Sequence, residues 1–134
     1  MNLVEKLMKF DRGKLDEIPT GEVEIKRLSK LMGEPFIVKC QAISGEMYAE
    51  IGSIMANKKG DLDMGKSYKV NTLLAVSGVI EPDLKNEELQ KHFGCKTPKD
   101  LVEVLFKGGD MTKVADLVTE LSGFAPEEDE EIKN

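Results

Sequence analysis

The stretch of residues 66–77 limits the fold more than any other, because its apolar residues lie on nearly all sides of a helix. A helix of this kind has to be surrounded by other elements of the chain. We therefore predict that it is the central helix of the protein. Gly78 is expected to take the left-handed position that ends this helix, with Val79 folding back on Leu74, and Pro82 prevents the helix from continuing.

Two segments that precede the central helix have the alternating pattern of half-exposed strands. In residues 22–27, valine and isoleucine alternate with charged residues, and in residues 36–42, Phe36, Val38 and Cys40 occupy alternate positions. The simplest arrangement is a two-stranded antiparallel unit. Such a unit is marginally stable alone, so it must pack on helices or pair with another chain.

Signals for helix ends divide the remainder of the chain into short helices. Ser44, Asn86 and Thr97 are suitable N-caps because their side-chain oxygens can accept free backbone amides, and Asp110 is expected to cap the last helix. A short amphipathic helix is also predicted over residues 3–10. The predicted fold class is α+β and mostly helical, with a small two-stranded antiparallel unit near the N-terminus followed by a bundle of about five helices.

Length and charge indicate one domain that does not coat nucleic acid or membranes. We predict a single domain over residues 1–124 and a disordered acidic tail over residues 125–134. The net charge of −6 opposes binding to nucleic acid or to an anionic membrane, since both require clustered cations. No apolar run reaches the ~18 residues of a membrane-spanning helix, and the first residues lack the features of a signal peptide, so we expect a cytosolic protein.

Few residues are suited to catalysis or metal binding. His92 is the only histidine, and its place near a helix end has a structural explanation, because an imidazole suits the negative end of the helix dipole. Cys40 and Cys95 are far apart in the sequence and are expected to be reduced, partly buried thiols. Asp61 and Asp63 lack the other ligands of a calcium loop. We therefore predict no catalytic, cofactor-binding or metal-binding residues, and no enzymatic activity.

A small regulatory DNA-binding module is the alternative interpretation. The helices predicted at residues 86–93, 97–106 and 110–122 could imitate a helix-turn-helix. However, residues 86–124 carry seven acids and five lysines. A surface with net negative charge is unfavourable for reading DNA, so nucleic acid is not the expected partner.

Several apolar residues lie where a small core does not obviously cover them. They surround the predicted strands and follow the ends of helices, and they are Leu28, Leu31, Met32, Phe36, Phe106 and Phe124. For any single residue, ordinary core packing is the simpler interpretation. As a group they predict a protein-binding surface, for a client protein or for a second copy of the chain.

The order of several motifs resembles a known family. These motifs are EVEIKRLSKLMGEPF at residues 22–36, SGEMYAEI at 44–51, NTLL at 71–74, GVIEP at 78–82, the FG and TP pairs within 93–98, and LSGF at 121–124. Each motif alone is weak, but their order and spacing are similar to those of the XkdN-like phage tail assembly chaperones. The resemblance covers residues 15–124.

The resemblance implies a chaperone that binds the phage tape-measure protein before the tail tube polymerises around it, with the tail tube protein as a further candidate partner. It implies no catalytic residue. The implied location is the cytoplasm of the host bacterium, and the protein is not expected in the mature virion. The oligomeric state, the residues that contact the client and the existence of a longer frameshifted product stay open.

Overall fold

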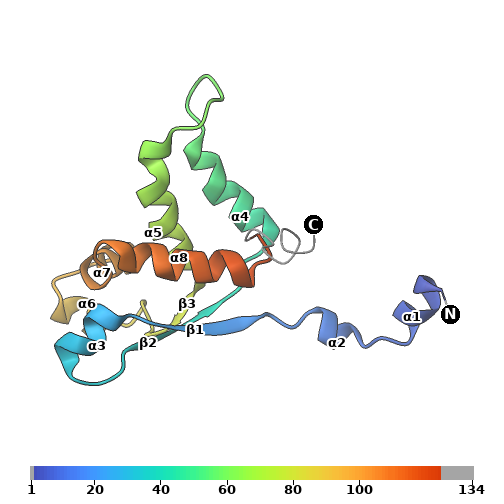
Figure 1. Ribbon diagram of the computed structural model, residues 1–134, viewed down its shortest axis with the longest axis horizontal. Coiled ribbons are helices and arrows are strands. Elements are labelled where there is room, and N and C mark those ends of the chain that lie inside the picture. Colours follow the sequence, from blue (N-terminus) through green and yellow to red (C-terminus); the bar gives the residue numbers. More distant parts are fainter. Residues whose placement is uncertain (1, 125–134) are drawn as a thin grey trace, which may run out of the picture.

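A computed structural model describes residues 2–124, which form an α+β fold around a three-stranded antiparallel sheet (Figure 1). The strands are β1 (Thr20–Glu24), β2 (Ile37–Gln41) and β3 (Val79–Glu81), and β2 lies between the other two. The described helices are α1 (Leu3–Met8), α2 (Arg12–Leu15), α3 (Lys26–Met32), α4 (Gly45–Gly52), α5 (Ser67–Gly78), α6 (Glu87–His92), α7 (Pro98–Leu105) and α8 (Gly109–Leu121), with short 3-10 turns at Ser53–Met55 and Met64–Lys66.

The alternating pattern of the strands gives the sheet one apolar and one charged face. Val23 lies opposite Val38, and Cys40 lies opposite Val79, so these side chains form the inner face. On the outer face, Lys39 lies opposite an acidic residue of each neighbouring strand. Such a sheet needs helices on one side only.

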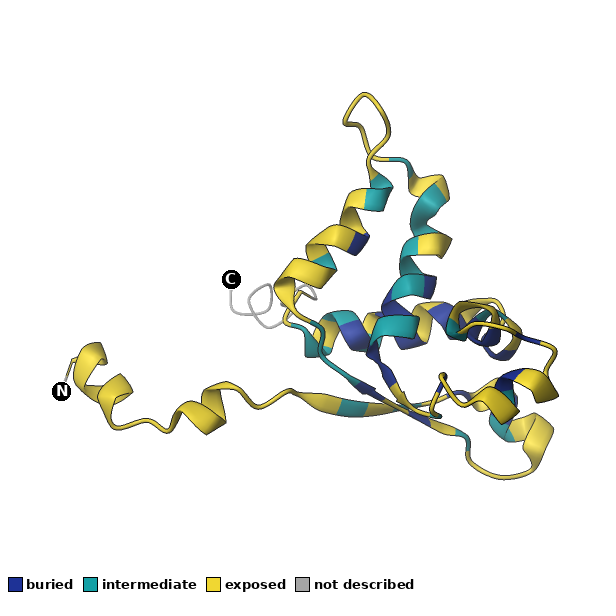
Figure 2. Ribbon diagram, turned by 180° about the vertical axis from the view of Figure 1, so that it is seen from behind, coloured by how far each residue is buried: buried dark blue, intermediate teal, exposed yellow. Residues whose placement is uncertain are grey.

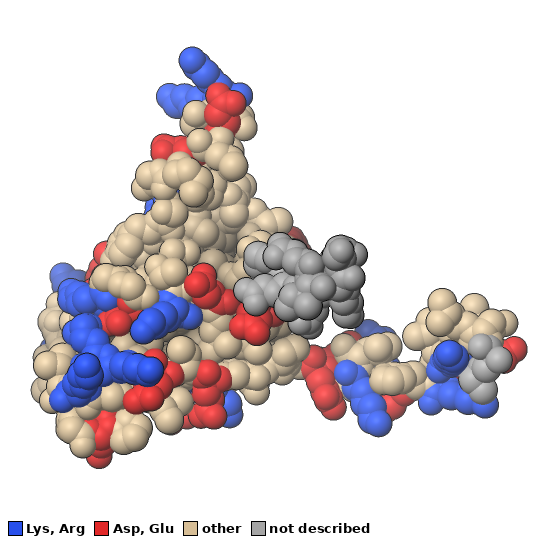
Figure 3. Space-filling view, in the orientation of Figure 1, with Lys and Arg blue, Asp and Glu red and all other residues tan. Residues whose placement is uncertain are grey.

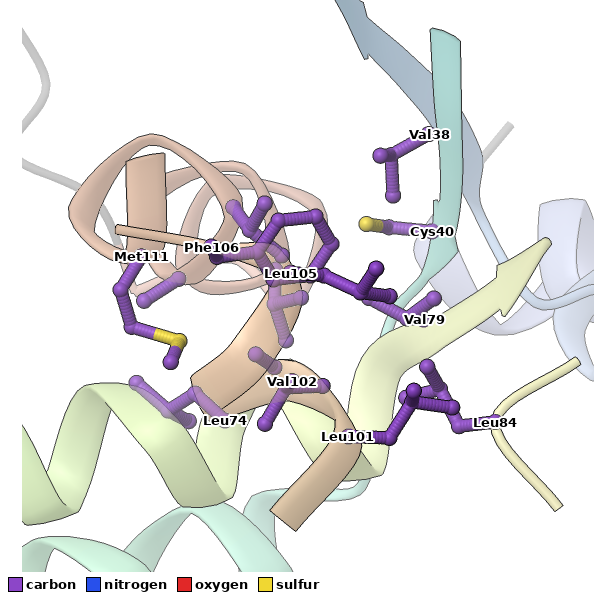
Figure 4. Close-up of a cluster of buried hydrophobic side chains, with 14 of the residues drawn as sticks. Val38, Cys40, Leu74, Val79, Leu84, Leu101, Val102, Leu105, Phe106 and Met111 are labelled. Carbon is purple, nitrogen blue, oxygen red and sulfur yellow. The ribbon is translucent and has the colours of Figure 1, made fainter. Parts of the chain in front are cut away.

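The core lies between this inner face and the helices α5, α7 and α8 (Figure 4). In α8 the buried residues Met111, Val114, Ala115 and Val118 recur at helical spacing, which places them on the side that faces the sheet and α5. Phe106, which follows α7, is 1% exposed and is the largest of the fully buried side chains in the described chain. The spacing of the apolar residues in α8 therefore matches its buried side.

The predicted two-stranded unit and five-helix bundle are wrong. A third strand, β3, starts directly after α5 and pairs with β2, and eight α-helices lie within residues 2–124. The third strand has only three residues, so it shows no alternating pattern of useful length. Its pairing with β2 joins segments about forty residues apart, which local signals cannot indicate.

The backbone conformation of Gly78 also differs from the prediction. It lies inside the last turn of α5 rather than in a left-handed position after it, and Val79 has an extended backbone. A Cβ atom at Gly78 would overlap the side chain of Val118, whose Cγ1 would be 2.8 Å away. Glycine is therefore needed here because α5 and α8 approach each other closely, not because of a turn.

The other helix ends largely follow the sequence signals. Ser44, Asn86 and Thr97 each accept a backbone amide from the residue three positions later, at 3.1, 2.9 and 3.1 Å. The N-cap of α8 is Gly108, so the prediction for Asp110 is wrong.

Asp110 instead joins α8 to α3. Its buried carboxylate accepts the Arg27 Nε–H at 2.7 Å and the Lys107 amide at 3.2 Å. A second nitrogen of Arg27 donates to the carbonyl of Leu105 at 2.8 Å. One guanidinium therefore connects α3 with the turn between α7 and α8, which orients α3 at its end of the sheet.

The helix predicted at residues 3–10 is present as α1, but it buries none of its residues. Residues 2–20 are all exposed, and Figure 2 shows α1 and α2 extending away from the rest of the structure. We call residues 2–18 the arm. The predicted acidic tail at residues 125–134 lies outside the described residues.

The Gly78→Ala variant should be less stable than the parent, with a free energy of unfolding lowered by about 1–2 kcal/mol. The new methyl group must displace Val118 in a packed core, and this overpacking outweighs the gain in helix propensity. Urea unfolding followed by circular dichroism measures the difference.

Gly52→Ala is the matched control for this prediction. Gly52 has a helical backbone, and a Cβ there would meet no atom within 4 Å, so its unfolding free energy should be unchanged or slightly higher. Equal stability of Gly78→Ala and the parent would contradict the close approach of α5 and α8.

Candidate protein-binding surface

The titratable side chains that the sequence singled out lie apart from one another in the described residues. No group of three or more His, Cys, Asp or Glu side chains within residues 2–124 is placed to hold a metal ion. His92 is exposed in the last turn of α6. Its imidazole ring packs edge-on against the ring of Phe93, with the ring centroids 4.8 Å apart. Its place in the last turn of α6 is the position that the sequence indicates for the histidine.

The two cysteines are buried thiols. Cys40 is 0% exposed in β2, and burial raises the pKa of its thiol to about 11, so the thiol is protonated at neutral pH. The Cys95 thiol, 8% exposed, lies 3.6 Å from the carbonyl oxygen of Phe93, to which it donates. Neither sulfur is poised as a nucleophile, because reactive cysteines are accessible and ionised.

A surface depression of about 510 Å³ lies beside α6, and mixed charges line it. Its lining includes Glu87, Gln90 and Lys91, followed by the turn at Cys95 and Lys96. The buried amide of Gln90 already donates to the carbonyl of Leu84 at 2.7 Å. In residues 2–124 no buried side-chain polar atom lacks a partner, so no such atom points into this depression.

The helix considered as a DNA reader presents little positive charge. In α7, Lys99 forms an ion pair with Glu103 at 3.0 Å, and that carboxylate raises the pKa of the lysine. The same helix buries Leu101, Val102 and Leu105 in the core. Its cation is therefore paired and its other contacts are structural, which leaves few groups to meet bases.

The six apolar residues singled out from the sequence fall into three different surroundings. Leu28 and Phe106 are 8% and 1% exposed and belong to the core, and Phe36 is half-buried against it. Leu31 and Met32 are 72% and 52% exposed at the end of α3. Phe124 is partly exposed and stacks on Tyr48 of α4, with ring centroids 4.0 Å apart.

Leu31 and Met32 lie in the last turn of α3, four residues before β2 begins. Gly33 ends α3 with a φ of 75°, and the amide of Phe36 donates to the Ser29 hydroxyl at 2.8 Å, which holds the connection against the helix. Ile37, 48% exposed, follows at the first position of β2. We call Leu31, Met32 and Ile37, the exposed apolar residues on either side of the connection from α3 to β2, the α3 surface. Ile37 was missed because its position in the strand pattern is the outward one.

Further exposed apolar residues lie on the arm and on the projection formed by α4 and α5. In the arm they are Leu3, Val4, Leu7, Met8, Phe10, Leu15 and Ile18. On the projection they are Met47, Leu62, Met64 and Tyr68. Below its charged tip, the projection is mostly uncharged in the view of Figure 3, whereas Lys, Arg, Asp and Glu gather over α3, α6 and α7.

These features define a small α+β protein whose described residues present exposed apolar surfaces rather than a cluster of reactive groups. A comparison with known protein families identifies the family to which the chain belongs. The chain belongs to the phage XkdN-like tail assembly chaperone proteins, because the model of that family matches residues 4–134.

A solved structure shares the fold. The crystal structure of the protein YqbN superimposes with a TM-score of 0.54 at 24% sequence identity, covering 81% of this chain and 90% of that chain. At this level of identity the likeness supports the fold alone. No curated protein matches the sequence significantly.

Within residues 2–124, each helix is too short or too polar to cross a membrane.

In a Cys95→Ala variant, the remaining thiol of Cys40 should react with Ellman's reagent at pH 8 only as fast as the protein unfolds. Burial keeps this thiol protonated and out of contact with the reagent. Absorbance at 412 nm, with and without urea, measures the rate. Rapid release of one equivalent from the folded protein would contradict the burial of Cys40.

Proposed function

We propose that this chain binds the phage tape-measure protein before the tail tube polymerises, and that it does so without catalysis. The supporting observation is the match of residues 4–134 to a family of tail assembly chaperones, combined with the exposed α3 surface. The client is proposed to be an apolar helical segment, which is the kind of surface that would aggregate if it stayed uncovered.

The chemistry of the α3 surface suits an amphipathic helix of the client. Leu31 and Met32 offer apolar contacts, and the flexible Met side chain adapts to different neighbours. Lys26 and Lys30 are exposed on the same short helix, so acidic residues at the border of the client's apolar face would be favoured. Arg27 is held by Asp110, which orients α3 in the absence of a client.

The α3 surface is small, and this suits reversible binding. Complete burial of one Leu or Met side chain contributes roughly 1.5–3 kcal/mol, so a few partly buried side chains give a modest affinity at each site. Many copies on a long client would cover it collectively. Because the chaperone binds only the free client, polymerising tube protein displaces it by mass action without nucleotide hydrolysis.

This mechanism also gives the proposed location. Binding takes place where client and tube protein are synthesised, which is the cytoplasm of the host bacterium. The tail tube protein competes for the client and is the second proposed partner. Displacement during polymerisation leaves the chaperone outside the mature virion.

Co-expression with the tape-measure protein tests the proposal. The wild-type chain should co-purify with the tape-measure protein and increase its soluble fraction, and Leu31→Glu/Met32→Glu should weaken binding at least about tenfold, because charges replace apolar contacts. Both residues are exposed, so circular dichroism should show an unchanged fold.

Leu62→Glu is the matched control, because Leu62 is 73% exposed but lies at the tip of the projection. It should bind the client as the wild type does. A tape-measure protein that stays equally soluble without this chain would contradict the proposed function. Equal co-purification of Leu31→Glu/Met32→Glu and the control would contradict the α3 surface as the site.

A further inference from the structure

The residues that follow α8 turn back toward the start of α4. Gly123 has a φ of 86°, a left-handed conformation that glycine adopts without strain at the end of a helix. The amide of Phe124 donates to the carbonyl of Thr119 at 3.0 Å, so the chain closes over the last turn of α8. This turn brings Ser122 and Phe124 to the connection between β2 and α4.

Two contacts join this turn to the start of α4. The Ser122 hydroxyl accepts the amide of Ile43 at 2.9 Å and donates to the carbonyl of Val118 at 2.7 Å, so it is used both as acceptor and as donor. The rings of Phe124 and Tyr48 are stacked, with centroids 4.0 Å apart and an interplanar angle of 2°. We call Ser122, Phe124 and Tyr48 the latch, and Figure 1 shows the end of α8 beside the start of α4.

The remaining support of α4 is limited. Ile51, 8% exposed, is its one buried residue, Tyr48 is half-buried, and every other residue of the helix is exposed. The helix packs mainly on α5 and on the 3-10 turn that follows it, whereas α5 is also packed against α7 and α8. A helix of eight residues is marginal in water, so α4 keeps its place only through such contacts.

The latch is itself only partly covered. Phe124 remains 46% exposed in the stack. An aromatic pair and a hydrogen bond are each modest contributions, and the loss of either changes a local equilibrium by about tenfold. The core between the sheet and the helices α5, α7 and α8 lies elsewhere, so α4 can separate from its neighbours while that core stays packed.

From these observations we propose that the latch gives the projection a closed and an open state. While Phe124 stacks on Tyr48, α4 is closed against α5. When the stack separates, α4 opens about residues 42–44, and the sheet, α5, α7 and α8 stay folded. Opening uncovers Ile51 and the side of α5 that α4 covers, so the end of α8 controls how much apolar surface the projection exposes. This control is separate from the α3 surface and does not depend on the identity of the client.

A permanent packing contact is the alternative interpretation of the stack. In that case α4 would unfold only together with the sheet, and loss of the stack would destabilise the whole domain. The latch instead predicts that α4 responds alone. Hydrogen exchange separates the two, because it measures the opening of each element by itself.

Hydrogen–deuterium exchange followed by mass spectrometry tests the proposal. In Phe124→Ala, the amides of α4 should exchange about tenfold faster than in the parent, whereas those of β2 and α7 should keep their rates. Tyr48→Phe retains a ring that can stack, so its α4 should exchange as in the parent. In a Tyr48→Ala background, Phe124→Ala should have no further effect, since both residues act through the same contact.

Phe93→Ala is the matched control for the exchange measurement. Phe93 is 42% exposed, close to the value for Phe124, but its ring packs against His92 at the end of α6. This variant should leave the exchange of α4 unchanged. Unchanged exchange of α4 in Phe124→Ala, equally faster exchange in β2 and α7, or a further acceleration in the Tyr48→Ala background would each overturn the proposal.

Discussion

The close approach of α5 and α8 at Gly78 is the constraint on which the rest of the structure depends. Because residue 78 has no side chain, Val118 can pack directly against the backbone of α5. At the same point the chain changes from helix to strand, and β3 begins at the next residue. The contact therefore sets the position of α8 and of β3 together, so that α8 also covers the inner face of the sheet. Apolar residues occupy alternate positions of the strands, so they all lie on the face of the sheet that α8 covers.

The ion pair between Arg27 and Asp110 extends this arrangement to the exposed part of the molecule. Asp110 belongs to the first turn of α8, so the packing of α8 also places its carboxylate. The carboxylate in turn holds Arg27 in α3, the helix that presents Leu31 and Met32. The proposed client surface is thus attached to the packed core, whereas the arm, which precedes β1 at the other end of the strand, buries none of its residues.

Local signals predicted much of the fold correctly. The caps at Ser44, Asn86 and Thr97 and the strand β2 appear where the sequence indicates them, whereas β1 ends at Glu24, earlier than the predicted 22–27, because α3 begins at Lys26. Each depends on neighbours a few residues apart. The errors concern contacts between distant segments: β3 pairs with β2, Gly78 meets Val118, and Asp110 pairs with Arg27 rather than capping α8. For the candidate site, an apolar residue near a helix end has the same local pattern whether it is buried, as Phe106 is, or exposed, as Leu31 is.

The sequence by itself determined the helix at residues 66–77, most of the helix ends and the membership in a family of tail assembly chaperones, but not how far that helix is covered, since Tyr68 in its first turn is 51% exposed. These properties are encoded in single residues, in their spacing and in their order. Only the tertiary structure decided that the sheet has three strands, that Leu28 and Phe106 are interior while Leu31 and Met32 are exposed, and that the amphipathic α1 has no cover in its own chain. Burial is the physical reason, because it depends on which distant elements pack together, and an amphipathic pattern shows that a segment needs a partner without showing which partner covers it.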